Sequence, residues 1–403
     1  MMKFGKKLTL MMVFMLMVSL VVAGCGQKPA ETSNEQAENS PTEAETSQED
    51  VIKIGVFEPL TGANAAGGAI ELEGVELANE LYPEVLGKKV ELVIVDNKSD
   101  KVEAANATAR LIEKEKVSAI IGSWGSSFSM AAGDAVRNSQ IPAIGASCTN
   151  PLVTLNNDYY FRACFIDPFQ GAVMANYAFN KLGAKKAAII QEVSSDYSVG
   201  LAKFFTDAFK KITDDESAIV GSASYNTGDQ DFTAQLTNIK QLKPDVIFAP
   251  GNFTESALLI KQAKQLGMDI PILGGDTWET QELIDIGGED IEGTVMSTFF
   301  TSEKPITEMS KVFLDKYREK YNKEPASCTA LGFDAYIMVI DAIKRAESSD
   351  PKAIRDALAE TKDFEGAAGI ITLDENGDAV KSAVIKVVKD GKFTYLDTVE
   401  PMK

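Results

Sequence analysis

Apolar and polar residues alternate along the chain in blocks that predict strands and helices in turn. Short apolar runs, such as VIKIGVF at 51–57 and VELVIVD at 90–96, have the length and β-branched content of buried strands. Between them, apolar residues recur at helical spacing, as over 70–81, where Leu72 and Val75 share one face. Strands alternating with helices are typical of a parallel sheet with helices on its faces. The pattern therefore predicts an α/β fold.

Two such series follow each other, and Asp167-Pro168 separates them. The remaining elements predicted are a strand over 293–300, long helices near 309–321 and 328–346, a helix over 351–360, and a C-terminal hairpin with its turn at Asp390-Gly391. The roughly 350 residues after position 50 are too many for one ordinary α/β lobe and suit two.

The first 25 residues have the pattern of a secretory signal. Lysines near the start precede an apolar run over 8–23, and VAGC at 22–25 ends it with small residues before a cysteine. This ending resembles a bacterial lipoprotein box. We expect residues 1–24 to be removed and Cys25 to carry a lipid that holds the protein on a membrane. The alternative is an uncleaved anchor, for which the run is short of the ~20 residues that span a bilayer.

Residues 25–50 follow as an acidic polar segment rich in Glu, Ser, Thr, Ala and Gln. Such a segment has too little apolar surface to fold, so we expect a disordered tether. A plain solubilising tail would behave in nearly the same way.

Composition narrows the possible chemistry. The chain has no histidine, which excludes Ser-His-Asp and Cys-His catalysis, an HExxH zinc site and an imidazole base. Its formal net charge is −19, and this acidity argues against nucleic acid as a partner because phosphate binding needs clustered Lys and Arg. No paired-carboxylate or metal-ligating pattern stands out. We therefore expect no enzyme activity, no cofactor and no metal.

Cys148 and Cys164 fall in consecutive predicted strand regions. Disulfides persist outside the cytoplasm, so a bond between these two cysteines is a hypothesis. With Cys25 lipidated, the odd number of cysteines leaves at least one thiol free or bonded to another molecule.

Seven short motifs stand in order, most of them at predicted strand ends. They are GVFEPLTGANAAGG at 55–68, IIGSWGSS at 120–127, IPAIGASCTNP at 141–151, YYFRACFIDPFQG at 159–171, DYSVGLA at 196–202, ILGGD at 272–276 and LGFDAY at 331–336. Each alone is weak. In their order and spacing, residues 51–403 resemble the periplasmic-binding-protein superfamily, in the branch of leucine/isoleucine/valine-binding proteins of ABC transporters.

The resemblance implies two doubly wound, Rossmann-like lobes joined by three crossings at a hinge. This is the type I periplasmic binding protein arrangement, with the ligand in the cleft between the lobes. We expect residues 51–167 plus about 298–370 in the N-terminal lobe, and 168–297 plus about 371–403 in the C-terminal lobe.

Candidate ligand-binding residues follow strands of the first lobe. Ser126 and Ser127 come between a strand and a helix, where hydroxyls and N–H groups suit a carboxylate; simple N-capping is the alternative. Thr149 follows the next strand in CTNP, where an ordinary Asn-Pro turn is the alternative. The resemblance implies that Ser126 and Thr149 hold the α-carboxylate of an amino acid.

The second lobe supplies Asp276 and Tyr197. The resemblance implies that Asp276 faces the ligand's ammonium, although Glu279 three residues later also fits a capping box. It likewise gives Tyr197 a ligand contact; the alternative is a partly buried aromatic at a helix start. A charge-assisted hydrogen bond contributes about 1.5–3 kcal/mol, enough to link closure to binding.

Aromatic residues near the same strand ends are candidates for an apolar wall of the site. They are Trp124, Phe128, Phe253 and Trp278, and packing within the lobes is the alternative. The resembled family often has an aromatic in the first loop, over the ligand side chain, where this chain has Gly67. We therefore expect a pocket that is wider or filled differently.

These features describe a monomeric, extracytoplasmic lipoprotein that is not an enzyme. It would capture a neutral or branched-chain amino acid between its lobes, close on it and deliver it to an ABC permease. The alternative is an extracellular ligand-sensing receptor subunit that uses the same two-lobed clamshell. The only membrane contact expected is the lipid on Cys25, apart from the permease.

Overall fold

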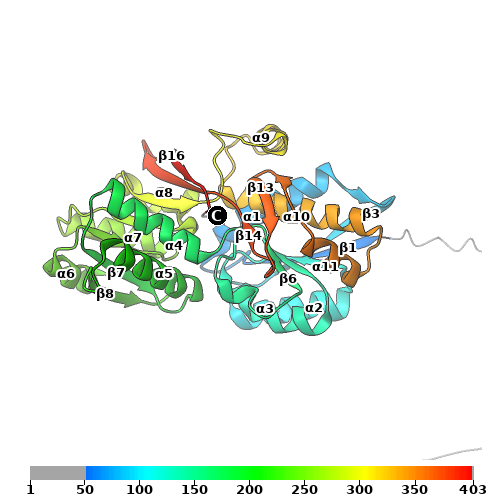
Figure 1. The fold of residues 1–403 in the computed structure, drawn as a ribbon, viewed down its shortest axis with the longest axis horizontal. Helices are drawn as coiled ribbons and strands as arrows, with labels where there is room; N and C mark the ends of the chain where they lie inside the picture. Colours follow the sequence, from blue (N-terminus) through cyan, green and yellow to red (C-terminus); the bar gives the residue numbers. More distant parts are fainter. Residues whose placement is uncertain (1–50, 402–403) are drawn as a thin grey trace, which may run out of the picture. The chain divides into compact units, whose positions relative to one another are not determined.

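The structure is a computed structural model, and it describes residues 51–401. The predicted signal, the Cys25 anchor and the tether lie outside the described residues. Strands and helices alternate as the sequence predicts, and they form two large sheets and one small sheet with helices packed on them (Figure 1). The α/β fold is confirmed. None of the helices within 51–401 is long and apolar enough to cross a bilayer.

The first sheet has six strands, and its centre is buried on both faces. In spatial order the strands are β2 (Glu84–Val85), β3 (Lys88–Asp96), β1 (Ile52–Glu58), β4 (Ala119–Ile121), β5 (Ala143–Gly145) and β6 (Tyr160–Arg162). All neighbours are parallel except β2 and β3. Val56 and Phe57 of β1 are fully buried in different hydrophobic clusters, as expected for side chains that alternate across a strand. We call this sheet and its helices the first lobe.

Helices cover both faces of the first sheet (Figure 1). One face carries α2 (Lys101–Arg110), its π-helical extension η1 (Leu111–Glu115) and α3 (Ser126–Ser139); the other carries α1 (Ala65–Leu81) and α10 (Ser327–Ala346). The last two approach closely. A Cβ on Gly74 would lie 1.9 Å from the Thr329 carbonyl oxygen, and one on Gly332 would lie 2.1 Å from that of Glu71. Only glycine at these two positions permits this contact.

The second sheet has seven strands, and with its helices it forms the second lobe. In spatial order the strands are β16 (Lys392–Val399), β15 (Ala383–Lys389), β11 (Val295–Thr298), β10 (Ile272–Gly274), β9 (Val246–Phe248), β7 (Ala187–Glu192) and β8 (Ile219–Tyr225). Its helical elements are α4 (Asp167–Asn176), η3 (Tyr177–Lys181), α5 (Asp196–Thr213), α6 (Thr233–Leu242), α7 (Phe253–Gln265), η4 (Asp276–Trp278), α8 (Gln281–Gly287) and η5 (Gly288–Ile291). The predicted hairpin is β15–β16. Its turn residues Asp390 and Gly391 both have positive φ, as the tight turn requires.

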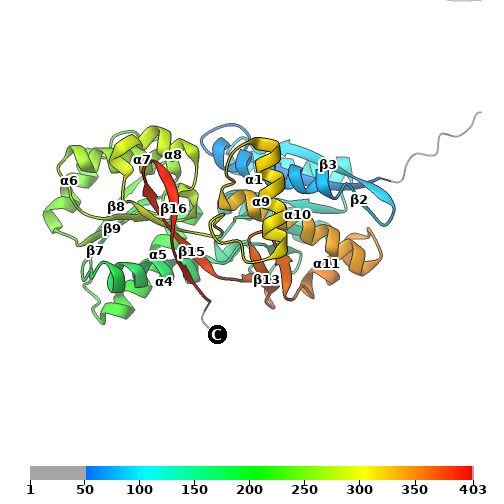
Figure 2. The same ribbon diagram turned by 90° about the horizontal axis from the view of Figure 1, so that it is seen from above.

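The chain passes between the two lobes three times. It leaves the first sheet after β6, returns after β11 as α9 (Glu308–Tyr321), α10 and α11 (Pro351–Ala359), and rejoins the second sheet at β15. Figure 2 shows α9 to α11 beside α1 and β3, with β15 and β16 among the second-lobe elements. Residues far apart in sequence therefore build each lobe.

A small sheet precedes the last crossing and was not predicted. It consists of β12 (Phe364–Gly366), β13 (Gly369–Leu373) and β14 (Ala379–Val380). A buried ion pair joins it to the first sheet, with Arg162 Nε 2.6 Å from Asp378 Oδ1. Strands this short carry too few residues to show an alternating pattern.

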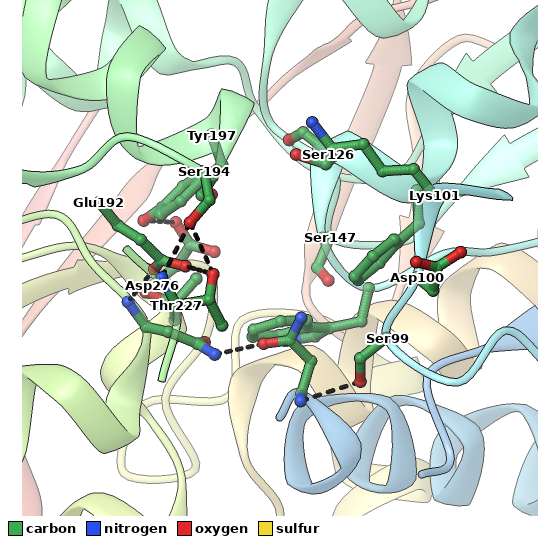
Figure 3. A pocket seen from close by; sticks show the side chains of 18 residues that line it. Ser99, Asp100, Lys101, Ser126, Ser147, Glu192, Ser194, Tyr197, Thr227 and Asp276 are labelled. Carbon is green, nitrogen blue, oxygen red and sulfur yellow. Dashed lines mark hydrogen bonds between the residues drawn. The ribbon is translucent and has the colours of Figure 1, made fainter. Parts of the chain in front are cut away.

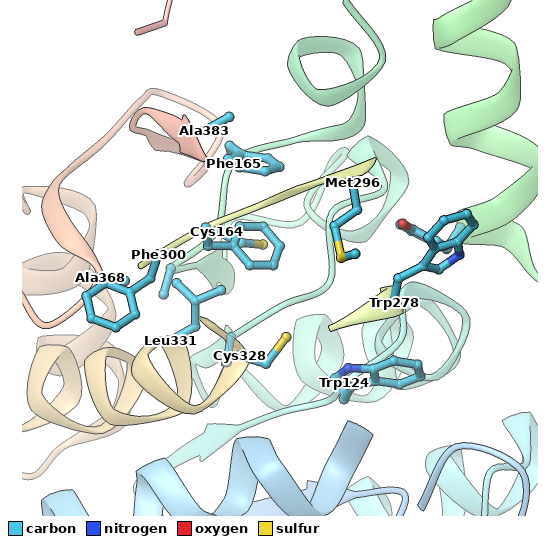
Figure 4. Packing of buried hydrophobic residues seen from close by; sticks show 14 of the residues in the cluster. Trp124, Cys164, Phe165, Trp278, Met296, Phe300, Cys328, Leu331, Ala368 and Ala383 are labelled. Carbon is cyan, nitrogen blue, oxygen red and sulfur yellow. The ribbon is translucent and has the colours of Figure 1, made fainter. Parts of the chain in front are cut away.

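The hypothesis of a Cys148–Cys164 bond is not supported, because Cys148, Cys164 and Cys328 are all free and buried. Cys148 packs with Tyr160 in the cluster beneath α2 and α3, whereas Cys164 packs in the other, larger cluster. Figure 4 shows Cys164 and Cys328 among apolar side chains such as Leu331. Burial raises the pKa of the Cys148 thiol to about 11, which keeps it protonated.

Candidate functional site

A cavity of about 340 Å³ is lined by residues of both lobes. The first lobe contributes Asn64, Ser99, Asp100, Lys101, Trp124, Gly125, Ser126, Ser127, Phe128 and Ser147; the second contributes Glu192, Ser194, Ser195, Tyr197, Thr227, Asn252, Asp276 and Thr277. These residues follow the carboxyl ends of parallel strands, where open α/β sheets bind ligands. Figure 3 shows the two groups facing each other, with Ser126 and Lys101 on one side and Asp276 and Glu192 on the other.

Ser126 and Ser127 form the start of α3, and their hydroxyls have different partners. Ser126 Oγ accepts a hydrogen bond from the Asn150 amide at 3.0 Å, so its own proton remains available to a ligand. Ser127 Oγ donates to Asp196 Oδ2 at 2.8 Å and accepts from the Asp196 amide at 2.9 Å. Ser126 is thus the hydroxyl suited to an anion at the helix N-terminus, while Ser127 joins the lobes.

Asp276 lies opposite, at the start of η4, and is 2 % exposed. Its Oδ1 accepts hydrogen bonds from Gln170 Nε2 at 2.7 Å and from the Tyr197 hydroxyl at 2.9 Å. Both bonds go to the same oxygen, which leaves Oδ2 for a ligand. Burial raises the pKa of Asp276 to about 6, and the two donors limit that rise. The carboxyl is therefore mainly ionised at pH 7.

Further buried acids lie behind the cavity. Glu58 accepts a bond from the Trp124 amide at 2.7 Å, and Glu71 accepts one from the Ser147 hydroxyl. Burial raises the pKa of Glu71 to about 7 and that of Asp167 to about 8, and burial together with the neighbouring Glu71 raises the pKa of Glu58. Asp167 is therefore largely protonated at pH 7 and Glu71 about half protonated, so the negative charge that favours a ligand ammonium group comes mainly from Asp276.

Three of the predicted site residues do not line the cavity. Thr149 is fully buried, and its carbonyl accepts a bond from the Asp167 amide at 2.9 Å. Phe253 packs behind Trp124, with ring centroids 6.2 Å apart. Trp278 is fully buried against Gly274. The aromatic rings that line the cavity are those of Trp124, Phe128 and Tyr197.

Gly67 has a steric explanation. A Cβ at this position would lie 2.3 Å from the Trp124 indole. Trp124 therefore occupies the space beside the first loop, and a side chain at position 67 is excluded. Trp124, in the loop after β4, forms this part of the cavity wall instead. The expectation of a pocket that is filled differently agrees with this geometry.

Several lining residues were not found from the sequence. Glu192, at the end of β7, accepts bonds from the Thr227 hydroxyl and, at 3.2 Å, from the Asn252 amide. The Asn252 side chain donates from Nδ2 to Asn64 Oδ1 on the other lobe. The available signal was position, because each of these residues lies at or just after the end of a strand, or at the start of a helix.

Asp196, at the start of α5, also joins the lobes. Besides Ser127, Lys101 Nζ lies 2.7 Å from its carboxylate, and Asn150 Nδ2 donates to its carbonyl at 2.8 Å. Partial burial would raise the pKa of Asp196, but the bonds from Lys101 and Ser127 outweigh it and the pKa is lowered. Within 51–401 no cluster of three or more Cys, Asp or Glu side chains is arranged to hold a metal ion.

Residues 51–392 match the family model described as periplasmic binding protein. Leu/Ile/Val-binding protein homolog 3 of Brucella melitensis is 30% identical over 356 residues, which cover 86% of this chain and 94% of the relative. The leucine-, isoleucine-, valine-, threonine-, and alanine-binding protein of Pseudomonas aeruginosa is 28% identical over 337 residues, with coverage of 82% and 87%.

Two solved structures are similar over nearly their whole length. The leucine binding protein LivK of Thermotoga maritima is 44% identical, with a TM-score of 0.85 and coverage of 87% of this chain and 99% of that one. The branched-chain amino acid transporter substrate binding protein LivJ of Streptococcus pneumoniae, in complex with isoleucine, is 35% identical. Its TM-score is 0.81, with coverage of 87% and 100%.

Proposed function

Because the chain belongs to the periplasmic binding protein family, we propose that it captures an amino acid in the cavity between its lobes and supplies it to an ABC transporter. The names of its relatives, which include leucine, isoleucine, valine and threonine, support an amino acid as the ligand class. The observation that carries the proposal is the placement of Ser126 at a helix start opposite the buried carboxylate of Asp276.

The two ends of an amino acid fit these two groups. The ligand carboxylate would accept hydrogen bonds from the Ser126 hydroxyl and from free N–H groups at the start of α3, where the helix dipole favours negative charge. The ammonium would donate to Asp276 Oδ2. Since the two groups belong to different lobes, one ligand satisfies both only when the lobes are close together.

The remaining parts of the proposal concern the cell. Family membership implies an extracytoplasmic solute-binding protein. We further propose that a lipid on Cys25 holds it at the membrane, that it works as a monomer, that it passes its ligand to permease subunits, and that it performs no catalysis on the bound amino acid.

Isothermal titration calorimetry tests the site after a thermal-shift screen has identified a binding amino acid. Asp276→Asn removes the charge but keeps the shape, and we expect affinity to fall about 10- to 150-fold, the equivalent of a charge-assisted hydrogen bond. Asp285→Asn makes the same change on an exposed residue of the same lobe and should leave affinity unaltered. Equal affinities for the wild type and Asp276→Asn would contradict the assignment.

The pH dependence follows from the same carboxyl. Since the pKa of Asp276 in the free protein is about 6, protonation below that pH removes the charge that the ammonium needs. Affinity should therefore decrease as the pH is lowered from 7 to 5, and this decrease should be much smaller in Asp276→Asn.

A further inference from the structure

The second-lobe wall of the cavity, beyond Asp276, presents hydrogen-bond acceptors. An amino acid held at Ser126 and Asp276 must direct its side chain into the remaining space, and Glu192, Thr227 and Asn252 line that space. Figure 3 shows Glu192 and Thr227 together on this wall. A wall built for purely aliphatic side chains would be apolar, as ligand pockets mostly are.

Asn252 has an unused acceptor. Its side chain is 6 % exposed and lines the cavity, and its Nδ2 donates to Asn64 Oδ1. Its Oδ1 is buried and has no hydrogen-bond partner within residues 51–401. A buried acceptor left unpaired lowers the stability of the complex, so a ligand that donates to it is favoured.

Glu192 adds acceptor capacity beside Asn252. It is 3 % exposed, and its two oxygens accept bonds from the Thr227 hydroxyl and the Asn252 amide. A carboxylate has about four acceptor positions, so these two bonds leave capacity for a ligand donor. On the first lobe, the hydroxyl of Ser99 is already used, since its Oγ donates to the Thr61 carbonyl at 2.7 Å.

The protein does not satisfy these acceptors with a charge of its own. Lys101 is the one lysine or arginine among the residues that line the cavity, and its ammonium lies 2.7 Å from Asp196 on the rim. The Lys101 side chain is about half exposed. No cationic side chain of the cavity lining is therefore bound to this wall, which leaves it open to a hydrogen-bond donor of the ligand.

We propose that the preferred ligand is an amino acid whose side chain carries a hydrogen-bond donor, a hydroxyl or an amide N–H, directed at Asn252 Oδ1 and Glu192. This inference rests on the proposed function. The methylene and methyl groups of such a side chain would pack against the Trp124 indole, which supplies the apolar part of the cavity.

Pairs of ligands with nearly equal shape test the proposal by calorimetry. Threonine and valine differ by a hydroxyl in place of a methyl, and asparagine and leucine differ in the same way by an amide. We expect the wild type to bind threonine more tightly than valine, and asparagine more tightly than leucine, on the order of tenfold in each pair. Valine and leucine binding as tightly as their polar partners, or more tightly, would overturn the inference.

Two variants separate the acceptor from the inter-lobe bond. Asn252→Leu removes both and should abolish the preference for threonine over valine. Asn64→Ala removes the bond but keeps Asn252 Oδ1, so affinity for both ligands should fall together and their ratio should persist. A threonine preference that survives in Asn252→Leu would contradict the role given to Asn252.

The outcomes also distinguish this inference from the proposed function. If amino acids bind but the polar partner is never preferred, the inference alone fails. If no amino acid binds, the proposed function fails and the inference fails with it. Should Asn252→Leu not fold, as judged by its circular dichroism melting curve, the comparison of ligand pairs on the wild type decides.

Discussion

At the scale of single residues, the buried acid Asp167 lowers the stability of the folded protein at neutral pH. Asp167 is fully buried, and neither of its oxygens has a hydrogen-bond partner among residues 51–401. Its pKa of about 8 lies above the ordinary value of 3.8 because burial disfavours the charged form. In this range the folded protein binds a proton that the unfolded chain has released. Asp167 therefore lowers stability as the pH rises from about 4 to 8.

Asp167→Asn should remove this dependence. We expect the variant to exceed the ligand-free wild type in stability at pH 8 by on the order of a few kcal/mol, and to match it near pH 3, where the wild-type carboxyl is mostly protonated in both states. Thermal unfolding at the two pH values measures the effect. The control Asp207→Asn alters an exposed acid of α5 and should shift both melting temperatures equally little. A wild-type pH slope that persists in Asp167→Asn would refute this explanation.

Residue roles were predictable where position alone decides them. Ser126, Tyr197 and Asp276 were found because each follows a predicted strand, and all three line the cavity. Glu71 was not found, because on a helix its spacing is that of any surface acid; only the packing of α1 against α10 and the loop after β5 buries it. A capping box with Glu279 was the alternative for Asp276, but Glu279 pairs with Lys386 in the interior.

At the scale of elements, the sequence predicted the long segments and missed the short ones. The β15–β16 hairpin is marked by its Asp-Gly turn and alternating pattern, and α1 by its apolar spacing. Yet α1 begins at Ala65 rather than 70, since its first turns are alanine and glycine that carry no periodic signal. The small sheet β12–β14 was not predicted because its strands are too short to show a periodic pattern. Long-range side-chain bonds hold this sheet in place.

Arg162 makes one of the long-range side-chain bonds that hold the small sheet β12–β14 in place. It is fully buried, and besides Asp378 it donates to the carbonyls of Cys148 (2.6 Å) and Asn150 (3.1 Å). Arg162→Met would leave a carboxylate and two carbonyls unpaired in the interior, so we expect a loss of about 3–5 kcal/mol in urea unfolding. Arg137→Met breaks only an exposed pair on α3 and should cost about 1 kcal/mol or less. Similar losses in both variants would contradict this assignment.

At the scale of the whole molecule, the ligand site exists only where the lobes meet. The α/β alternation and the motif order predicted the two-lobed fold, but not which side chains join the lobes. Ser127, predicted to bind ligand, lines the cavity, but the bond of its hydroxyl to Asp196 across the cleft was not predicted. Such pairs depend on the relative placement of two separately folded sheets, which no local pattern encodes.

Weakening that contact should shorten the lifetime of the closed state. Asp196→Asn removes the charge that Lys101 and Ser127 contact, and because the pair is largely exposed we expect ligand dissociation to accelerate only about 2- to 5-fold, with little change in association. Stopped-flow fluorescence can follow this through Trp124, which lines the cavity. Asp207→Asn disrupts an exposed ion pair within α5 and should leave both rates unchanged. An unaltered dissociation rate in Asp196→Asn would show that the contact does not hold the lobes together.

The return of α10 to the first sheet also sets an order for making the molecule. Synthesis releases β1 to β6 first, but the helix that covers one face of their sheet follows only after the strands β7 to β11 have emerged. Until α10 arrives, the Gly74 surface of α1 remains uncovered. A nascent or secreted chain therefore completes its first lobe late. A fragment cut after β6 or β11 lacks one wall of that lobe, so the lobes cannot be separated by cutting the chain at a single point.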